Sequence, residues 1–285
     1  MVFFVTIVTL FWRTFLKKIL SFAFLVLVAF SLQAQVSLAS VKDGYYFAQE
    51  DKFASDGWKN QAVVKVSGGK IVEATWNGVS NAAYARDKMS QAAAGRYGMI
   101  KASKIKTEWD AQAKTTAAYL VSTQDVNFSK YGKDGKTDAI SGATMAVSVF
   151  YDLVRKALAG QSVAKGPYTD GWYFYEQPEF DRSGWKETVL VTVVNGSVVD
   201  LVWNGVSNKA GSKSKIVEST TGKYKMGAKN GEWHVQSARL SAAIVAAGDP
   251  AKIAVKKDGK TDAVSGVSIY ANAVGLSLEA LKAAK

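Results

Sequence analysis

The chain contains two copies of one pattern, and this internal repeat constrains the possible fold more than any other feature. Residues Asp43–Phe47 (DGYYF) return as Asp170–Phe174 (DGWYF), and Trp76–Asn81 (WNGVSN) returns unchanged as Trp203–Asn208. Both pairs lie 127 positions apart, as 203 minus 76 shows. A repeat of this length has the size of a domain and not of a solenoid unit. The sequence therefore predicts two tandem domains with the same fold.

The later parts of the two copies match at a slightly shorter spacing. Residues Glu108–Trp109 correspond to Glu232–Trp233, and Asp134–Ala139 (DGKTDA) recurs as Asp258–Ala263, at an offset of 124 (258 minus 134). A short deletion upstream of Glu232 in the second copy explains the change. A Gly-Pro turn signal at position 166 separates the copies. We expect a first domain at residues 40–160, a linker at 161–169 and a second domain at 170–285.

Each copy has the pattern of an α+β domain, with strands first and helices after them. Three short runs in the first copy read as strands, and the Gly-Gly pair in the first copy and the Asn-Gly pair in the second are typical hairpin turns. Later segments are rich in Ala, Gln and Lys, or carry apolar residues every three or four positions, as helices do. Expected strands are Tyr45–Phe47, Ala62–Val66 and Lys70–Trp76, and expected helices are Asn81–Ala94, Glu108–Val121 and one that begins near Gly142. The sequence therefore predicts two small antiparallel sheets, each packed with helices.

The N-terminus has the pattern of an export signal. Basic residues at 13, 17 and 18 precede an apolar run at Ile19–Phe30, and small residues follow at two cleavage positions, after Ala34 or after Ala39. The run is shorter than the ~20 apolar residues that a membrane span needs. Because residues 1–12 are also apolar, an uncleaved anchor is the alternative. We expect an exported, periplasmic or extracytoplasmic protein, with residues 1–39 as signal peptide or anchor.

The composition excludes most metal-based redox chemistry. The chain has no cysteine and a single histidine, His234, so disulfides, iron–sulfur clusters, cysteine-ligated zinc and attached c-type haem are excluded. Any redox chemistry must then use an organic cofactor. Lys and Arg number 36 against 24 Asp and Glu, a balance that favours peripheral contact with an anionic membrane surface. The lysines lack the aromatic interleaving of a nucleic-acid groove, so no nucleic-acid partner is expected.

The segment Asp138–Thr144 (DAISGAT) carries the clearest chemical signal. Gly142 lies between small residues at the expected start of the closing helix, so a phosphate could approach the backbone closely. Unpaired N–H groups in a first helical turn favour a bound anion, and Thr144 would place a hydroxyl beside it. The alternative is an ordinary Asx or Ser helix cap. A calcium loop is excluded, because only Asp134 and Asp138 are available and no terminal Glu follows at the required spacing.

This segment, together with Trp109 and Gln112 upstream and the closing helix, resembles the flavinylation motif of FMN-binding domains. Such domains occur in the C subunit of Na⁺-translocating NADH:quinone oxidoreductase, in the G subunit of the Rnf complex and in exported flavoproteins with tandem domains. In that family an FAD-dependent FMN transferase with Mg²⁺ joins the FMN phosphate to the motif threonine outside the cytoplasmic membrane. The resemblance covers both copies and implies covalent FMN at Thr144. The recognition residues that it implies are Asp138, Ser141, Gly142 and Ala143.

The second copy departs from this motif at two positions. Its segment at 262–268 reads DAVSGVS, with Val for Ala and Ser for Thr. Serine keeps the nucleophilic oxygen but lacks the β-methyl that restricts χ1 of threonine, and Val267 adds bulk beside the reacting group. Covalent FMN at Ser268 is therefore one possibility, with non-covalent flavin or no flavin as the alternatives. The corresponding candidate residues are Asp262, Ser265, Gly266 and Ser268.

Several other residues have two interpretations each. Trp76 and Trp203, with the Asn-Gly-Val-Ser-Asn after each, are candidates for lining a flavin, or else core residues that end a strand before a turn. Tyr97 and Tyr224 are weaker candidates of the same kind. The runs YYF and WYF resemble the surface aromatics of wall-binding modules, or else alternate in half-buried strands. His234 has no repeat counterpart and is expected to be a surface or hydrogen-bonded residue.

The combined interpretation is an exported flavoprotein electron carrier. We expect FMN at Thr144, and as a second possibility at Ser268, with electrons passing from a membrane donor to an extracytoplasmic acceptor. No acid–base constellation stands out around either motif, which favours a carrier over a substrate-specific oxidoreductase. The linker would set the reach of the two flavins. The alternative function is an envelope-surface protein that binds a wall polymer or small ligand through its aromatic repeats.

Overall fold

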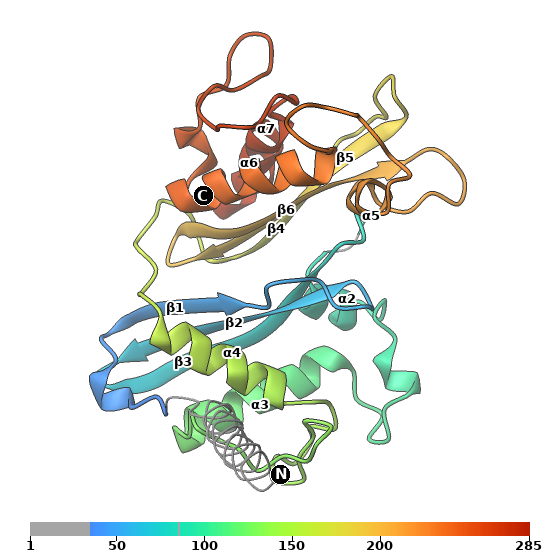
Figure 1. The fold of residues 1–285 in the computed structure, drawn as a ribbon. Helices are drawn as coiled ribbons and strands as arrows, with labels where there is room; N and C mark the ends of the chain where they lie inside the picture. Colours follow the sequence, from blue (N-terminus) through green and yellow to red (C-terminus); the bar gives the residue numbers. More distant parts are fainter. Residues whose placement is uncertain (1–34, 85) are drawn as a thin grey trace, which may run out of the picture. The chain divides into compact units, whose positions relative to one another are not determined.

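Two three-stranded antiparallel sheets, one for each copy of the repeat, form the frame of the molecule (Figure 1). This computed structural model describes residues 35–84 and 86–285. The expected export segment lies outside the described residues as far as residue 34. Among the helices of the described residues, none is long and apolar enough to cross a membrane. The predicted α+β class, with two small sheets each packed with helices, is confirmed.

The first sheet is a meander with the order β1-β2-β3. β1 (Gly44–Gln49) pairs with β2 (Trp58–Ser67), which turns at Gly68-Gly69 and pairs with β3 (Lys70–Ser80). Both turn glycines have φ in the left-handed region, at 59° and 70°, which glycine adopts without the steric cost of a Cβ. The predicted strands and hairpin turn are present, and β2 and β3 extend beyond the predicted runs.

The second sheet repeats this meander with the order β4-β5-β6. β4 (Gly171–Glu176) pairs with β5 (Trp185–Val194), and β5 pairs with β6 (Ser197–Ser207). The hairpin turn is Asn195-Gly196, with φ of 50° and 78°, as in the two-residue turns that match the twist of the flanking strands. Strand order and hairpin position therefore correspond between the copies.

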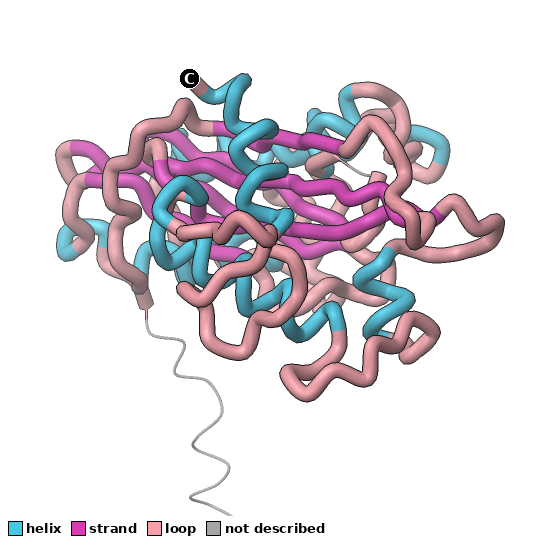
Figure 2. Tube along the Cα trace, turned by 90° about the horizontal axis from the view of Figure 1, so that it is seen from above, coloured by secondary structure: helices cyan, strands magenta, loops and turns pink. Residues whose placement is uncertain are grey.

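Corresponding helices pack on the two sheets (Figure 1), and the view from above shows helices lying over the strands (Figure 2). In the first copy α3 contacts β3 while α4 contacts β1 and β2, and in the second copy α6 contacts β6 while α7 contacts β4 and β5. Apolar side chains between helices and sheet form one buried cluster in each copy. The α-helices are α2 (Lys88–Ala93), α3 (Trp109–Thr123), α4 (Ser148–Ala159), α5 (Lys215–Thr220), α6 (Trp233–Ala247) and α7 (Asn272–Ala280). Short 3-10 helices are η1 (Leu38–Ser40), η2 (Met99–Lys101), η3 (Pro250–Lys252) and η4 (Leu281–Ala284).

Two boundaries expected in the first copy are wrong. The helix expected over Asn81–Ala94 is reduced to α2, because the Asp87 carboxylate accepts the Ser90 N–H (3.0 Å) and caps the helix there. The turn considered after Trp76 does not form, because β3 continues through Gly78 in antiparallel pairing with β2. Pairing with a neighbouring strand therefore outweighs the local preference of an Asn-Gly pair for a turn.

Buried polar side chains join the two sheets. Asp200 of β6 accepts hydrogen bonds through Oδ1 from Lys59 (3.2 Å) and Gln49 (3.0 Å), and through Oδ2 from Gln61 (2.9 Å). Gln61 is fully buried and accepts the indole N–H of Trp172 (2.7 Å). These donors and acceptors are satisfied only when both sheets are in place, so the network holds the two copies together.

The linker is not a free tether between the copies. The Val163 N–H donates to the Tyr45 carbonyl oxygen (2.7 Å), and the Gly166 N–H donates to the Asn195 carbonyl oxygen (2.8 Å). The linker is thus fixed to the first strand of one copy and to the hairpin turn of the other. Residues 36–285 form one unit. The expectation that the linker sets the reach of the two flavins is therefore wrong, because direct contacts fix the spacing of the two copies.

The aromatic runs in the first strands of the two sheets are half-buried. Tyr46 is 4% exposed, and its hydroxyl donates to the Lys42 carbonyl oxygen (2.7 Å). Trp172 and Phe174 of β4 pack against a small apolar cluster that contains residues of both copies. The first run alternates between buried and half-buried residues, whereas all residues of the second run are half-buried. Neither run is fully exposed, which argues against an aromatic surface for a polymer.

Candidate functional site

The candidate attachment segment of the first copy consists of turns between α3 and α4. The Ala143 N–H bonds to the Ile140 carbonyl oxygen (3.2 Å), and Gly142 has a φ of 85°, which residues with a Cβ rarely adopt. Ala143 is buried, whereas Asp138, Ser141 and Gly142 are exposed. The turn therefore requires the glycine and leaves its own backbone open to the surface.

Thr144 follows this turn and is held by one side chain of α3. The amide oxygen of Gln112 accepts both the backbone N–H (2.8 Å) and the hydroxyl (3.1 Å) of Thr144. Gln112 is fully buried, and its Nε2 donates to the Thr107 carbonyl oxygen (3.2 Å) and to the Ser103 hydroxyl (3.3 Å), which fixes the amide orientation. The hydroxyl proton of the half-buried Thr144 is thus directed to Gln112, and its oxygen lone pairs remain available.

The second copy presents Ser268 in the same way. The amide oxygen of Gln236 accepts the backbone N–H (2.7 Å) and the hydroxyl (3.1 Å) of Ser268. Gln236 is fully buried, and its Nε2 donates to the Gly231 carbonyl oxygen (2.8 Å). Both glutamines come three residues after the tryptophan that begins their helix, so the repeat itself indicates that they are equivalent.

The expectation that Thr144 lies in the first turn of a helix is wrong. α4 begins at Ser148 and α7 begins at Asn272, each four residues after the candidate hydroxyl (148 minus 144, and 272 minus 268). In the first copy the Ser148 N–H bonds to the carbonyl oxygen of Gly135 (3.1 Å), in a turn upstream of the motif. The N-terminal turn of α4 therefore does not supply the anion site at Thr144 that the sequence predicted.

Cationic side chains lie closer to the motif in the second copy. The Arg239 guanidinium donates to the Gly266 carbonyl oxygen (2.9 Å), and the repeat places Thr115 at the equivalent position of the first copy (239 minus 124). Lys256 forms an ion pair with Asp262 of the motif (3.1 Å). In the second copy the Arg239 guanidinium thus lies against the glycine turn, whereas the equivalent residue of the first copy is the smaller Thr115.

Trp76 and Trp203 are core residues. Trp76 is 3% exposed, lies edge-on to Trp109 with ring centroids 5.4 Å apart, and stacks on Phe150 at 5.4 Å with an interplanar angle of 23°. Trp203 is 2% exposed and lies edge-on to Trp233 at 5.1 Å. Both tryptophans are almost fully buried against other aromatic rings, so the structure favours the core interpretation over contact with a flavin.

Sequence reasoning missed a buried lysine beside this core. Lys88, the first residue of α2, is 5% exposed. Its Nζ lies over three aromatic rings, those of Trp58 (5.3 Å), Tyr97 (4.8 Å) and Trp109 (4.8 Å). We call these four residues the first cage. Burial lowers the pKa of the Lys88 ammonium to about 8, against the attraction of nearby carboxylates.

The second copy has an equivalent cage. Lys215 begins α5, is 5% exposed, and its Nζ lies over Trp185 (5.6 Å), Tyr224 (5.6 Å) and Trp233 (4.8 Å). We call these four residues the second cage. The two lysines are 127 positions apart, the offset of the repeated segments before them (215 minus 88). The occurrence of a lysine at this position in both copies was the sequence signal for the cages. Tyr97 and Tyr224 are thus cage residues.

The repeated segment WNGVSN positions these lysines. The Asn77 Oδ1 accepts the Met89 N–H (2.9 Å) at the start of α2, and the corresponding bond of Asn204 at the start of α5 is 3.0 Å. A Cβ at Gly78 would lie 3.4 Å from Lys88 Cδ and 3.2 Å from a backbone oxygen, so glycine leaves room for the lysine stem. Support of the cage therefore explains this segment.

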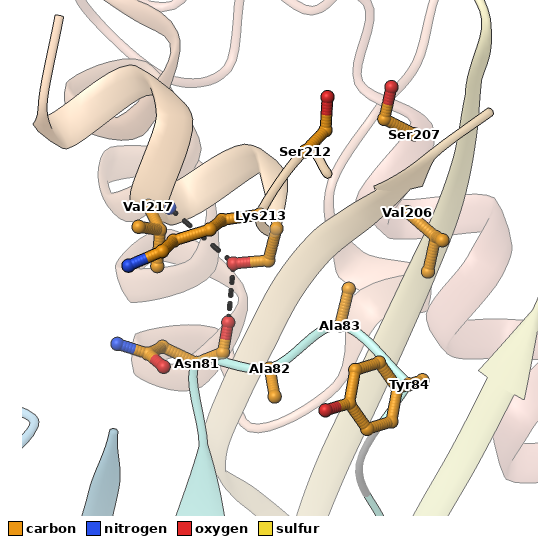
Figure 3. A pocket seen from close by; sticks show the side chains of 10 residues that line it. Asn81, Ala82, Ala83, Tyr84, Val206, Ser207, Ser212, Lys213 and Val217 are labelled. Carbon is orange, nitrogen blue, oxygen red and sulfur yellow. Dashed lines mark hydrogen bonds between the residues drawn. The ribbon is translucent and has the colours of Figure 1, made fainter. Parts of the chain in front are cut away.

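Several cavities of the described residues lie away from the motifs. One of about 330 Å³ lies beside Tyr84, where the Ser214 hydroxyl donates to the Asn81 carbonyl oxygen at 2.5 Å (Figure 3). Another of about 440 Å³ is lined in part by His234, whose Nδ1 bonds with the Ser219 hydroxyl (2.9 Å), so His234 is a hydrogen-bonded residue. Over residues 35–84 and 86–285, no group of three or more His, Cys, Asp or Glu side chains could hold a metal ion.

Comparison with known proteins identifies solved structures without a stated activity. No family model matches the chain, and no curated protein matches it. A Clostridium thermocellum protein with a solution NMR structure is 42% identical over 40% of this chain and 90% of its own, with a TM-score of 0.32. A Clostridium perfringens protein with a crystal structure is 26% identical over 42% of this chain and 87% of its own, also with a TM-score of 0.32. Each alignment spans less than half of this chain.

Proposed function

We propose that the protein is an exported electron carrier that holds FMN through a phosphoester bond at Thr144. The observation that carries the proposal is the environment of the Thr144 hydroxyl. It follows a glycine turn, it is half-buried, and its proton is directed to the buried amide oxygen of Gln112 (3.1 Å). A positioned hydroxyl with free lone pairs is what an acceptor in phosphoryl transfer requires.

The residues around Thr144 fit the phosphate end of FMN. Ser141 and Gly142 are exposed, and a Cβ at position 142 would meet only Thr115, at 3.6 Å, so the turn is open to a bulky group. When bound, FMN supplies one- or two-electron redox chemistry. The protein supplies the attachment point and the charges around it.

Attachment requires a second enzyme. The Thr144 oxygen would bond to the FMN phosphorus of FAD, the pyrophosphate bond to AMP would break, and the hydroxyl proton would pass to a base. Gln112 is a neutral amide and cannot serve as that base. Within the described residues, the hydrogen bonds of the Thr144 hydroxyl and N–H go to Gln112 alone. We therefore propose that an FMN transferase with Mg²⁺ provides the base and the FAD.

Ser268 is proposed as a second and weaker attachment site. Its hydroxyl has the same contact with a buried glutamine, at 3.1 Å from Gln236 Oε1. Against this, Arg239 crosses the adjacent glycine turn and Val267 replaces a smaller alanine. The same presentation with a more obstructed approach supports partial modification.

The proposed setting is the outer face of the cytoplasmic membrane, with a membrane donor and an extracytoplasmic acceptor. The export pattern at residues 1–39 supports this location, and a covalent bond would prevent loss of the cofactor outside the cell. The excess of 36 basic over 24 acidic residues should speed encounter with anionic surfaces, and salt should slow it.

Stopped-flow reduction by membranes supplied with NADH tests the carrier role. We expect the flavinylated protein to be reduced by membranes and reoxidised by a soluble acceptor, whereas protein made without the transferase should show no flavin signal. A flavin that stays oxidised with every membrane donor, while a defined small substrate reduces it stoichiometrically, would contradict the carrier role and indicate an oxidoreductase. A fluorescent band that survives denaturing electrophoresis separates both from a polymer-binding protein.

A further inference from the structure

The two lysine cages differ in the position of a carboxylate. In the second cage Glu187 forms an ion pair with Lys215 (Oε1 to Nζ, 3.1 Å), and both side chains are 6% exposed. The repeat places Asn60 where the second copy has Glu187 (187 minus 127). Among the described residues, no carboxylate lies within ion-pair distance of Lys88. Within the part of the chain that the structure describes, the first cage therefore holds a buried cation without a counter-ion in contact.

In the first copy the carboxylate belongs to Glu50, which is hydrogen-bonded to Asn60, and not to residue 60 itself. In the first copy, the Glu50 carboxylate accepts the N–H (2.6 Å) and the Nδ2 (2.8 Å) of Asn60, whereas in the second copy the Gln177 amide oxygen accepts the N–H of Glu187 (2.9 Å). The inner residue of each pair also accepts the indole N–H of the adjacent core tryptophan, at 3.1 Å in the first copy and 3.2 Å in the second. The inner positions are thus 60 and 187, and the outer positions are 50 and 177. Each copy keeps one carboxylate and one amide, with their places exchanged.

A buried ammonium without a counter-ion is held at a cost. The faces of three aromatic rings attract the ammonium, but they compensate its loss of hydration less than a carboxylate in contact would. The charged and titratable groups that face Lys88 are the carboxylates of Asp56 and Glu50, which attract it without contact, and the phenol of Tyr97. Burial raises the pKa of Tyr97, so this phenol stays neutral and does not supply the missing charge. An anion near the first cage is therefore attracted by the charge of Lys88. In the second cage the charge of Lys215 is already paired with Glu187.

The first cage and the attachment site share one helix. Trp109 of the cage begins α3, and Gln112, which holds Thr144, lies three residues later. Three residues of an α-helix rise by about 4.5 Å, a little less than one turn. The residue that holds Thr144 therefore lies about one helical turn from Trp109 of the cage.

We propose that Lys88 is the positive charge that the first copy provides to its flavin, so that the reduced and anionic form is favoured. This inference rests on the proposed function. Two electrons and one proton from an outside reductant convert the oxidised ring to its reduced anion, while Lys88 keeps its own proton and stabilises the added negative charge across a low-dielectric interior. In the second copy Glu187 already neutralises Lys215. A flavin in the first copy therefore has the higher midpoint potential.

An exchange of the inner and outer residues tests this inference. The double variant Glu50→Gln with Asn60→Glu gives the first copy the pair of the second, keeps the net charge, and leaves an acceptor for the indole of Trp76. In a Ser268→Ala background the flavin at Thr144 is the one measured, by titration with dithionite and redox dyes. We expect the midpoint potential to fall by about 30 mV or more. A fall of about 30 mV corresponds to a tenfold loss of preference for the reduced form.

Lys88→Met in the same background removes the charge and keeps an unbranched apolar stem, so it should lower the potential as well. Lys215→Met is the matched control and should leave the potential of the first flavin unchanged. Intact mass separates the two proposals. Absence of FMN from Thr144 in the Ser268→Ala parent would overturn the proposed function. FMN that is attached but has an unchanged or raised potential in both the exchange variant and Lys88→Met would overturn this inference alone.

Discussion

The two copies present their candidate hydroxyls alike and differ in the charges around them. The hydroxyls of Thr144 and Ser268 each lie 3.1 Å from a buried glutamine oxygen. The second copy pairs its caged Lys215 with Glu187, whereas in the first copy no carboxylate of the described residues forms an ion pair with Lys88. A duplication that keeps geometry and relocates charge indicates that two equivalent sites can have different electrostatic properties.

Removal of the counter-ion in the second copy should have the largest effect on stability. Glu187→Gln leaves Lys215 buried without its carboxylate, and breaking one partner of a buried pair costs about 3–5 kcal/mol. Urea denaturation would measure this as a lower free energy of unfolding. Glu73→Gln, in the exposed pair with Lys65, is the control and should leave the unfolding midpoint unchanged. A loss for Glu187→Gln no greater than for the control would contradict the account of the second cage.

The pH dependence of stability should show the burial cost of Lys88. Its pKa is lowered to about 8 in the folded state by burial, and the ordinary value for lysine is about 10.4. Below the folded pKa both states are charged and the cost is fully present. Between the two values the folded state has released its proton and the unfolded state has not, so stability rises with pH.

The free energy of unfolding of the native protein, measured relative to that of Lys88→Met, should therefore rise by on the order of 3 kcal/mol between about pH 7.5 and 10.5. Denaturation of both proteins across this range measures the difference and cancels the titration of other groups. A difference that is constant with pH would show that Lys88 is not a buried charged group.

The two motif glycines should respond differently to substitution. Gly142→Ala forces a Cβ onto a residue with φ of 85° and should cost about 1 kcal/mol. Gly266→Ala should cost somewhat more, because its Cβ would also lie 2.9 Å from the Arg239 guanidinium. Adding Arg239→Thr should remove the excess, which a double-mutant cycle by urea denaturation can measure. Equal costs without that coupling would contradict the view that Arg239 crosses the second turn.

The smallest expected effect is on modification of the second copy. Ser268→Thr with Val267→Ala restores the motif of the first copy, and should raise the doubly modified fraction modestly in intact-mass spectra because it restricts χ1 and clears space. Arg239→Thr added to this variant should raise it further. An unchanged fraction would indicate that other differences in the second copy exclude flavin.

The strands and hairpins could be predicted from sequence because their signals are local. Alternation along a strand and the φ preferences of Gly68 and Asn195 act within a few residues. The start of α4 could not be predicted in this way. It depends on a hydrogen bond from Ser148 back to Gly135, within turns whose hydrogen bonds the helical spacing of apolar residues does not reveal.

The cages could be predicted only in part. Trp58, Tyr97 and Trp109 come from a strand, a loop and a helix, and no local pattern shows that they meet around Lys88. The repeat offset does identify Lys88 and Lys215 as equivalent residues. The glutamine contacts of the candidate hydroxyls likewise follow from tertiary packing, although the repeat marks the two glutamines as a pair.

The central claim is that Thr144 carries FMN, and the most direct measurement is the mass of the peptide that spans residues 137–155. In protein co-expressed with an FMN transferase, we predict that this peptide gains the mass of FMN less one water. Thr144→Ala should remove the gain and leave the fold intact, since it removes only the side-chain bond to Gln112. An unmodified native peptide under conditions that modify a known flavinylated domain, or FMN still on this peptide in the alanine variant, would contradict the account.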